Sequence, residues 1–314
     1  MSDKKRVLLI GGSVMELSLN MYRMPDPGES ATDDGGVAYL PSGTDAPTAA
    51  ALARLGAQCA LCSRLGADLH GQRLFEFYKS RDIVTTYMKV DRDYSTGLSV
   101  CIKEGVKAPR SIYYPGANEH LTAENVAEAF AFAPGALVIG HGVPFATRLS
   151  AMKLAAERGI PILMSADGLA DCTDTDLLPT ADILYVDDSD VFALTGLHAG
   201  SMTASLQAAA KLSKRLAFRH LIIRLGARGT FLYQGTRYDQ IPPYGNYKRT
   251  PEMTGIDECF TAALVLSYMS DPSSIQKSIA FASAASACAV ARGGGWAAFP
   301  TAEELSAFIS RGTV

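Results

Sequence analysis

Apolar segments with two different periodicities alternate along most of this chain. Short runs rich in β-branched residues, such as 137–139 and 221–223, are bounded by glycine or charged residues, as is typical of strands covered on both faces. Longer segments between them have the period of a helix. This alternation predicts an α/β fold, a doubly wound parallel sheet with helices on both faces. The pattern predicts strands at 7–10, 58–63, 136–140, 160–164, 182–186 and 219–224, and helices at 48–55, 68–80, 122–132, 146–158, 201–216 and 261–269.

Three early segments do not follow this alternation. Residues 14–22, 36–41 and 97–115 resemble β-strands that are separated by turn residues rather than by helices. We interpret them as a small separate sheet that projects from the main body. The length of 314 residues fits a single large α/β domain over 1–314.

Composition narrows the range of partners. The net charge of -3 provides no basic surplus to neutralise nucleic-acid phosphates. The chain has no apolar run of about 18 residues to span a membrane, and the run 7–10 is too short for the core of a signal peptide. Cys59 and Cys62 have the spacing of half a zinc site but lack a second pair. We therefore expect a cytoplasmic protein with reduced thiols and a small-molecule partner, which binds neither nucleic acid nor membrane.

A glycine turn before the helical run 261–269 is the first candidate for chemistry. Gly255 precedes Asp257 and Glu258 there. The N–H groups and the positive dipole at a helix N-terminus hold anions such as phosphate. Glu258, beside a bound phosphate, could accept a proton from an attacking alcohol. The alternative is that both acids only favour the helix N-terminus.

Loops that follow strands are further candidates, because ligands of open parallel sheets bind outside the carboxyl ends of the strands. Arg224, Gly226 and Gly229 follow one strand, and the two glycines would let the backbone approach a nucleotide closely. A plain hairpin turn is the alternative. Asp187 and Asp190 follow another strand and could hold Mg²⁺ through water, or could simply cap a helix.

Taken in order, these features resemble the ribokinase-like (PfkB-type) carbohydrate kinases over essentially the whole chain. The resemblance implies a Rossmann-like domain that binds ATP, a β-sheet lid over a sugar, a homodimer formed through the lid, and transfer of the γ-phosphoryl group to a hydroxyl. It also places Ser283 with the nucleotide. The stretches that carry the resemblance are 11–16, 24–29, 53–57, 66–71, 115–118, 225–229 and 254–260.

The chain departs from the family pattern at the phosphate-binding turn. The family usually has Thr-Gly-Ala-Gly-Asp, whereas Ile256, Asp257 and Glu258 occupy the last three places here. A carboxylate about 5 Å from a phosphate would cost on the order of 3 kcal/mol per charge at an effective dielectric constant of about 20. This cost shrinks if Asp257 faces solvent or binds a cation.

The sugar-binding positions are altered as well. Glu16 stands where an Asp usually binds hydroxyls, and Gly43 and Asp45 lie in the loop that would contact the sugar. Gly142 replaces a Glu, which leaves His141 as the nearest polar group. These changes argue against ribose as the substrate.

The metal positions differ from the family in the same way. The family's Asn-x-x-Glu is replaced by Asp187 and Asp190, whose shorter side chains could still serve Mg²⁺ through water. Near the usual site of a monovalent cation, Glu252 replaces Asp and Ala298 replaces Ser, so potassium activation is not expected.

Two functions fit these residues. The first is an ATP-dependent carbohydrate kinase in which Glu258 is the base, Gly255 and its neighbours hold the phosphoryl group, and Asp187 and Asp190 orient Mg²⁺. The second is a catalytically weakened relative that binds a nucleotide or a polyol as a sensor or scaffold.

Overall fold

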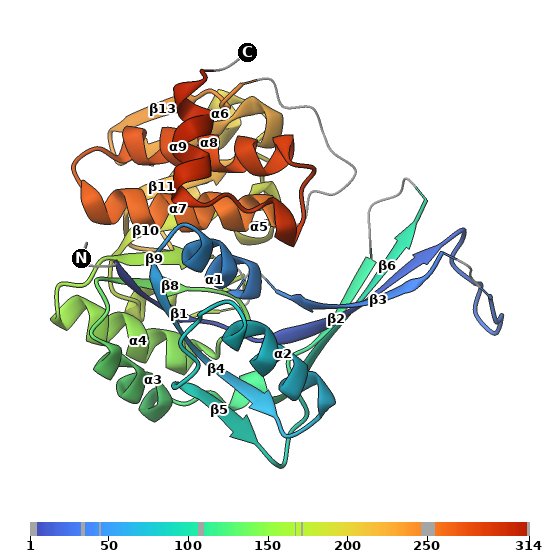
Figure 1. Ribbon diagram of the computed structural model, residues 1–314. Helices are drawn as coiled ribbons and strands as arrows, with labels where there is room; N and C mark the ends of the chain where they lie inside the picture. Colours follow the sequence, from blue (N-terminus) through green and yellow to red (C-terminus); the bar gives the residue numbers. More distant parts are fainter. Residues whose placement is uncertain are drawn as a thin grey trace.

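A nine-stranded sheet forms the centre of the computed structural model (Figure 1). The structure describes residues 5–32, 35–43, 45–105, 110–166, 168–170, 172–245 and 255–312. The first seven strands in the following order are parallel, as the alternating pattern predicts, and the last two form an antiparallel edge. From one edge to the other the strands are β5 (Met88–Asp91), β4 (Gln58–Gly66), β1 (Arg6–Ile10), β8 (Ala136–Ile139), β9 (Ile162–Ser165), β10 (Ala181–Val186), β11 (Phe218–Arg224), β12 (Thr230–Gln234) and β13 (Arg237–Ile241).

Helices cover both faces of this sheet and enclose two hydrophobic cores. Successive side chains of a strand point to opposite faces, so Leu9 of β1 belongs to one core and Leu8 to the other. One face is covered by α1 (Asp45–Arg54), α2 (Leu69–Lys79), α7 (Ile256–Ser270), α8 (Ile275–Ala291) and α9 (Ala302–Ser310). The opposite face is covered by α3 (Ala123–Ala129), α4 (Phe145–Glu157), α5 (Asp188–Thr195) and α6 (Met202–Leu212). None of the helices in the described ranges is long and apolar enough to cross a bilayer.

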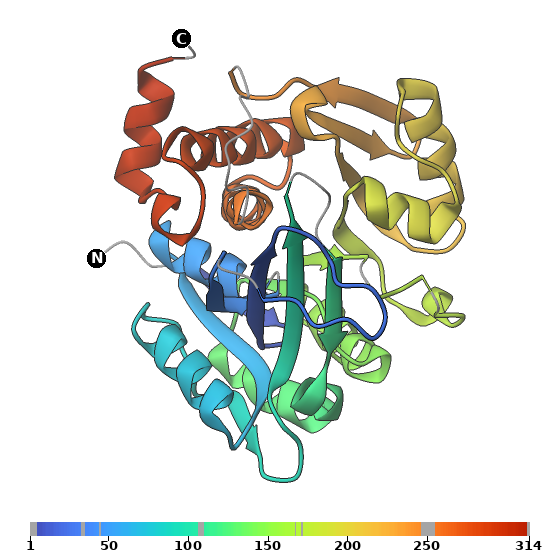
Figure 2. The same ribbon diagram turned by 90° about the vertical axis from the view of Figure 1, so that its right-hand side faces the viewer.

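A four-stranded sheet projects from the main body, as Figures 1 and 2 show from two sides. Its central strands pair in parallel, and its outer strands are antiparallel to them. This sheet confirms the small separate sheet expected from the early β-like segments. Its strands, in order, are β3 (Val37–Ser42), β2 (Val14–Met21), β6 (Gly97–Glu104) and β7 (Arg110–Tyr114).

Asn118 fixes the loop that joins the two sheets. This side chain is 1% exposed; it accepts a hydrogen bond from Ser13 N at 2.9 Å and donates to Ser13 O at 3.0 Å and to Pro115 O at 2.9 Å. The Ser13 hydroxyl in turn accepts hydrogen bonds from Ser63 and Tyr78. The segment between β1 and β2 is therefore held by buried hydrogen bonds to three other elements.

A second clamp lies at the start of α2. The Asp68 carboxylate caps this helix through Gly71 N at 2.8 Å and also accepts bonds from the backbone and hydroxyl of Thr96, both at 2.7 Å. A Cβ on Gly71 would overlap the carbonyl of Gly66. Residues 66–71 thus tie the strand β4 to the segment that enters the small sheet, which is a structural role for this family-like motif.

Replacing Asn118 by Ala is expected to destabilise the protein by about 2 to 4 kcal/mol, because the buried N–H and carbonyl of Ser13 and the carbonyl of Pro115 each lose a hydrogen bond. Urea unfolding of the wild type and the variant measures this loss. Asn20→Ala is the matched control, since among the described residues the Asn20 amide makes one exposed contact, of 3.4 Å, with Gly35 O. A loss below about 1 kcal/mol for Asn118→Ala would contradict the assigned role.

Candidate active site

The carboxyl ends of β1, β8, β10 and β11 lie at one edge of the main sheet, because these strands are parallel. Several residues singled out from the sequence lie at these ends: His141 follows β8, Asp187 and Asp190 follow β10, and Arg224 ends β11, just before Gly226 and Gly229. The N-terminus of α7 reaches the same edge, since Asp257 in its first turn contacts Arg224 at the end of β11. The sheet therefore brings the glycine turn before α7 next to the strand-end loops.

Gly255 caps the N-terminus of α7 in a left-handed conformation, with φ of 82°. A Cβ at this position would lie 2.6 Å from ring atoms of Phe299, so the tight turn and the close approach both require glycine. The first N–H groups of an α-helix have no intrahelical acceptor. The turn therefore presents the N–H groups of Ile256, Asp257 and Glu258 at the positive end of a 15-residue helix.

Arg224 neutralises the acid that replaces a family glycine. Its Nη2 and Nε lie 2.9 and 3.2 Å from Oδ1 of Asp257, and its guanidinium lies 4.1 Å from the centre of the Phe260 ring. The Arg224 side chain is 10% exposed and that of Asp257 is 61% exposed. Asp257 thus both faces solvent and binds a cation, the two conditions that reduce its repulsion of a phosphate. Arg224, which the sequence placed at the nucleotide, pairs here with the first turn of α7.

Glu258 is partly buried beside this ion pair. Loss of hydration, and secondarily the Asp257 carboxylate, raises the pKa of Glu258 from its usual 4.5 to about 7. A carboxyl group with this pKa holds and releases a proton near neutral pH, which is the property of a general base or acid.

Tyr185, near the end of β10, lies close to the first turns of α5 and α7. The sequence did not indicate it as a site residue. Its ring lies 5.9 Å from that of Phe260. Burial, followed by the carboxylates of Asp257, Glu258 and Asp187, raises the pKa of the Tyr185 phenol well above its usual value. The phenol therefore stays protonated in the midst of three acids and can donate a hydrogen bond to an anion.

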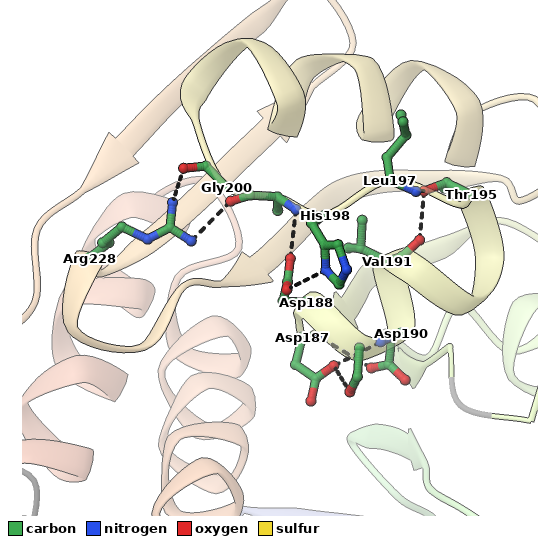
Figure 3. Close-up of polar contacts among 11 residues, drawn as sticks. Asp187, Asp188, Asp190, Val191, Thr195, Leu197, His198, Gly200 and Arg228 are labelled. Carbon is green, nitrogen blue, oxygen red and sulfur yellow. Dashed lines mark hydrogen bonds and ion pairs between the residues drawn. The ribbon is translucent and has the colours of Figure 1, made fainter.

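Asp187 and Asp190 form a reciprocal cap at the start of α5 (Figure 3). Asp187 Oδ1 accepts from Asp190 N at 2.8 Å and from the Ser189 hydroxyl at 2.6 Å, while Asp190 Oδ2 accepts from Asp187 N at 3.1 Å. The helix-capping interpretation is therefore correct for both residues. Within the described part of the chain, no cluster of three His, Cys, Asp or Glu side chains has the arrangement of a metal site.

A neighbouring clamp holds the loop between β11 and β12 (Figure 3). Arg228 donates to the carbonyls of Gly200 at 2.8 Å and Ala199 at 3.0 Å. The same short segment is bound from the other side by Asp188, which accepts from Ala199 N at 2.6 Å and lies 2.9 Å from His198 Nδ1. The β11–β12 loop is thus fixed relative to α5, and it is also a hairpin turn, as the simpler interpretation proposed.

The two glycines of this loop differ in their surroundings. Gly226 has a φ of 59° and no atom within 4 Å of the position of a Cβ, so a ligand can approach its backbone. Gly229 instead packs on the backbone of Ile241 and Pro242. Further along, Ser283 of α8 lines a cavity of about 700 Å³ together with residues 239–245.

The predicted sugar-binding residues lie where β1, β2 and α1 meet. Glu16 of β2 accepts a 2.8 Å hydrogen bond from the Ser42 hydroxyl. This bond offsets part of the free energy that is lost when a carboxylate is partly buried in a strand. Gly43 has a φ of 76° in the turn before α1. Asp45 is 1% exposed, and a Cβ on either Gly11 or Gly140 would overlap its carboxylate. Asp45 therefore packs between two strand-end loops in the described conformation.

His141 is covered by an aromatic residue of the small sheet. Its ring stacks on that of Tyr113, with a 6.0 Å separation of the ring centres and an interplanar angle of 12°. A Cβ on Gly142 would lie 2.5 Å from the Tyr113 hydroxyl. Tyr113 therefore occupies the space that a longer side chain at position 142 would need. The sequence gave no sign of this contact, because it joins two different sheets.

Of the two residues expected near a monovalent-cation site, the structure describes Ala298. Glu252 lies outside the described residues. Ala298 is 1% exposed in a short 3₁₀ turn, Trp296–Ala298.

Comparisons with known proteins agree on one family. The family model for pfkB family carbohydrate kinases matches residues 4–302. A ribokinase from Haemophilus influenzae is 24% identical over 310 residues, which cover 98% of this chain and 99% of that protein. A bifunctional ribokinase/ribose-5-phosphate isomerase A from Fructilactobacillus sanfranciscensis is 26% identical over 98% of this chain. The chain spans only 56% of the length of that bifunctional protein.

Solved structures share the fold. A ribokinase from Arabidopsis thaliana, complexed with ribose and ATP, superposes with a TM-score of 0.86. The match covers 98% of this chain and 99% of that one at 22% sequence identity. It supports the expected architecture of a large parallel sheet with a small separate sheet.

The raised pKa of Glu258 predicts a pH-dependent effect on stability. Folded Glu258 keeps its proton up to about pH 7 and unfolded Glu258 only up to about pH 4.5, so this residue lowers stability as the pH rises between these values. Glu258→Gln is therefore expected to raise the free energy of unfolding at pH 8 by up to about 3 kcal/mol, and to have little effect near pH 4.

Urea unfolding at both pH values measures this difference. Glu157→Gln, at an exposed position of α4, is the control and should show the same small effect at each pH. A Glu258→Gln effect that does not change with pH would show that the carboxyl has an ordinary pKa.

Proposed function

Because the chain belongs to the pfkB family of carbohydrate kinases, we propose that it transfers the γ-phosphoryl group of ATP to a hydroxyl of a sugar-like small molecule. The observation that carries this proposal is the arrangement at the start of α7. There a glycine turn, a carboxyl with a pKa of about 7 and a neutralised second acid lie together.

The strongest argument against catalysis is that the negative charge of Asp257 would repel the phosphoryl group. An uncompensated Asp257 would repel the transferring phosphoryl group by an amount that could slow the reaction about a hundredfold. Its ion pair with Arg224 removes most of this repulsion and leaves the helix N-terminus attractive to an anion. The Arg224 side chain would therefore support phosphate binding through Asp257.

Glu258 would act as the base. In the proposed step, a hydroxyl of the substrate gives its proton to a Glu258 carboxylate oxygen while its own oxygen attacks the γ-phosphorus of ATP. The bond from that phosphorus to the bridging oxygen breaks, and ADP leaves. A pKa near 7 suits this role, because the proton-accepting form is abundant at neutral pH and still basic enough to take the proton.

The nucleotide would bind between the β11–β12 loop and α8. The open space at Gly226 would admit a phosphate or a ribose, and the cavity beside Ser283 would take the adenine ring. Arg228 contributes indirectly, because its bonds to the carbonyls of residues 199 and 200 hold the loop in place. We place Gly229 among the structural residues of this site, since it packs on the neighbouring backbone.

Asp187 and Asp190 would hold Mg²⁺ through water. The Asp187 side chain is exposed and has its second oxygen outside the cap, so this donor set fits a hydrated, hard cation better than a direct protein cage. When bound with ATP, Mg²⁺ would neutralise negative charge on the phosphates.

The acceptor would lie between the small sheet and the loops after β1 and β8. Glu16, oriented by Ser42, would accept hydrogen bonds from hydroxyls of the substrate, and the backbone at Gly43 would contact it. His141 and Tyr113 would form an aromatic wall. The buried Asp45 would act by positioning the loops that surround the substrate rather than from an exposed surface.

The small sheet would also provide the interface of a homodimer. Several large apolar side chains are exposed on it, including Val37 at 57%, Ile112 at 69% and Tyr114 at 51%. We keep the cytoplasm as the proposed location, where the six cysteines, none of them in a disulfide, would stay reduced.

Incubation with Mg-ATP and a panel of hexoses, pentoses and nucleosides is expected to yield ADP with at least one acceptor. The rate should rise with pH up to about 7, as Glu258 loses its proton. Glu258→Gln should lower kcat by about 10²-fold or more, whereas Glu157→Gln should leave it unchanged. Nucleotide binding without turnover of any acceptor would instead support the rival function, a weakened relative that acts as a sensor or scaffold.

A double-mutant cycle tests the compensation of Asp257 by Arg224. Arg224→Gln alone should lower kcat/KM for ATP by about a hundredfold, because it exposes the phosphate to an unpaired carboxylate. Asp257→Asn alone should have a small effect. The double variant should recover about tenfold or more of the loss caused by Arg224→Gln. Strictly additive effects would show that the two residues act independently.

A further inference from the structure

A second cavity, of about 320 Å³, lies at the ends of α1 and α2, next to the C-terminal segment. Residues 50, 53 and 54 of α1, residues 80–82 after α2, and the rings of Trp296 and Phe299 line it. Its volume is at the lower end of the range for small-molecule sites and corresponds to about ten water molecules. The cavity shares no lining residue with the proposed nucleotide and acceptor sites.

The lining side chains carry an excess of positive charge. Arg54 and Arg81 contribute two charges and Asp82 opposes one of them. Glu304 approaches Arg54 only to 3.8 Å; its oxygens are bonded to Arg292 at 2.9 Å and to Thr301 N at 2.7 Å. The cavity therefore favours an anion.

Arg81 is held in place by aromatic rings instead of by an acid. Its guanidinium lies 3.8 Å from the centre of the Phe77 ring and 5.9 Å from that of Trp296. Across the described ranges, no acidic side chain lies within 4 Å of it. The Ser80 hydroxyl, 3.2 Å from an Arg81 nitrogen, adds a polar group at the same end. A charge supported in this way can bind an incoming anion without first breaking an ion pair.

Apolar groups form the rest of the lining. Ala50, Ala53, Trp296 and Phe299 supply a surface of methyl groups and ring carbons. Such a surface favours a ligand with an apolar part over a bare, fully hydrated ion.

We propose that this cavity binds a small organic anion, with its phosphate or carboxylate between Arg54 and Arg81 and its apolar part against Trp296 and Phe299. The occupant acts on the phosphate-binding turn through Phe299. That ring lines the cavity, and it also lies where a side chain on Gly255 would clash. Restricting Phe299 therefore restricts the first turn of α7.

Trp296 provides a direct readout, because it is the only tryptophan of the chain. Titration with phenyl phosphate is expected to change its fluorescence in a saturable way. Arg81→Gln should weaken this binding by about tenfold or more. Lys79→Gln removes an equal charge from an exposed position on α2 outside the cavity, and it should bind within about twofold of the wild type. This readout does not depend on kinase activity.

Two further probes define the ligand class. Phenol, which lacks the charge, should not bind, and inorganic phosphate, which lacks the ring, should bind more weakly than phenyl phosphate. The site is disproved if no saturable change occurs or if Arg81→Gln binds as well as the wild type. Equal binding of inorganic phosphate would disprove the role of the apolar lining.

Hydrogen exchange tests the coupling to α7. Saturating phenyl phosphate should slow exchange at residues 255–260 in the wild type and should not do so in Arg81→Gln at the same concentration. The comparison excludes phenyl phosphate bound at the turn itself, because Arg81 does not touch that turn. Unchanged exchange in the wild type at saturation would overturn the coupling.

Discussion

The ion pair of Arg224 with Asp257 joins the end of a central strand to the first turn of α7, and the proposed chemistry depends on it. A helix N-terminus attracts anions only if its neighbours do not cancel the dipole. The negative charge of Asp257 would cancel part of the dipole. The Arg224 guanidinium offsets this charge and is held over the Phe260 ring. The same junction places Glu258 where lost hydration and a neighbouring carboxylate raise its pKa to about 7. One contact would therefore both protect the proposed anion site and help to set the environment of the proposed base.

The residues that resemble the family divide into two groups by their contacts. Asn118 makes buried hydrogen bonds and Asp68 partly buried ones that hold the two sheets relative to each other, and Gly229 packs on backbone. Gly226 instead has open space around its Cβ position, and the Glu258 carboxyl lies in the first turn of α7, where burial raises its pKa. The first group explains why the fold persists at low sequence identity. Near the second group, Arg224 pairs with Asp257, and the ring of Tyr113 stacks on that of His141 at the predicted acceptor site.

Local signals predicted most of the architecture and part of the site. The parallel strands follow from short apolar runs, and Gly255 with Glu258 follows from a turn next to a helix. The pattern gave no helix for α8, because twelve of its seventeen residues are buried and no polar stripe marks its period. It gave no strand for β13, whose residues are mostly exposed. The pairing of Arg224 with Asp257 and the stacking of Tyr113 on His141 join distant segments, so only the fold reveals them.

The most direct test of the account is a crystal structure of the protein with a non-hydrolysable ATP analogue and Mg²⁺. The account predicts that the terminal phosphate accepts hydrogen bonds from the backbone N–H groups at the start of α7, while Arg224 remains paired with Asp257. A terminal phosphate bound away from this helix, or an Arg224 that leaves Asp257 to bind the phosphate itself, would contradict it.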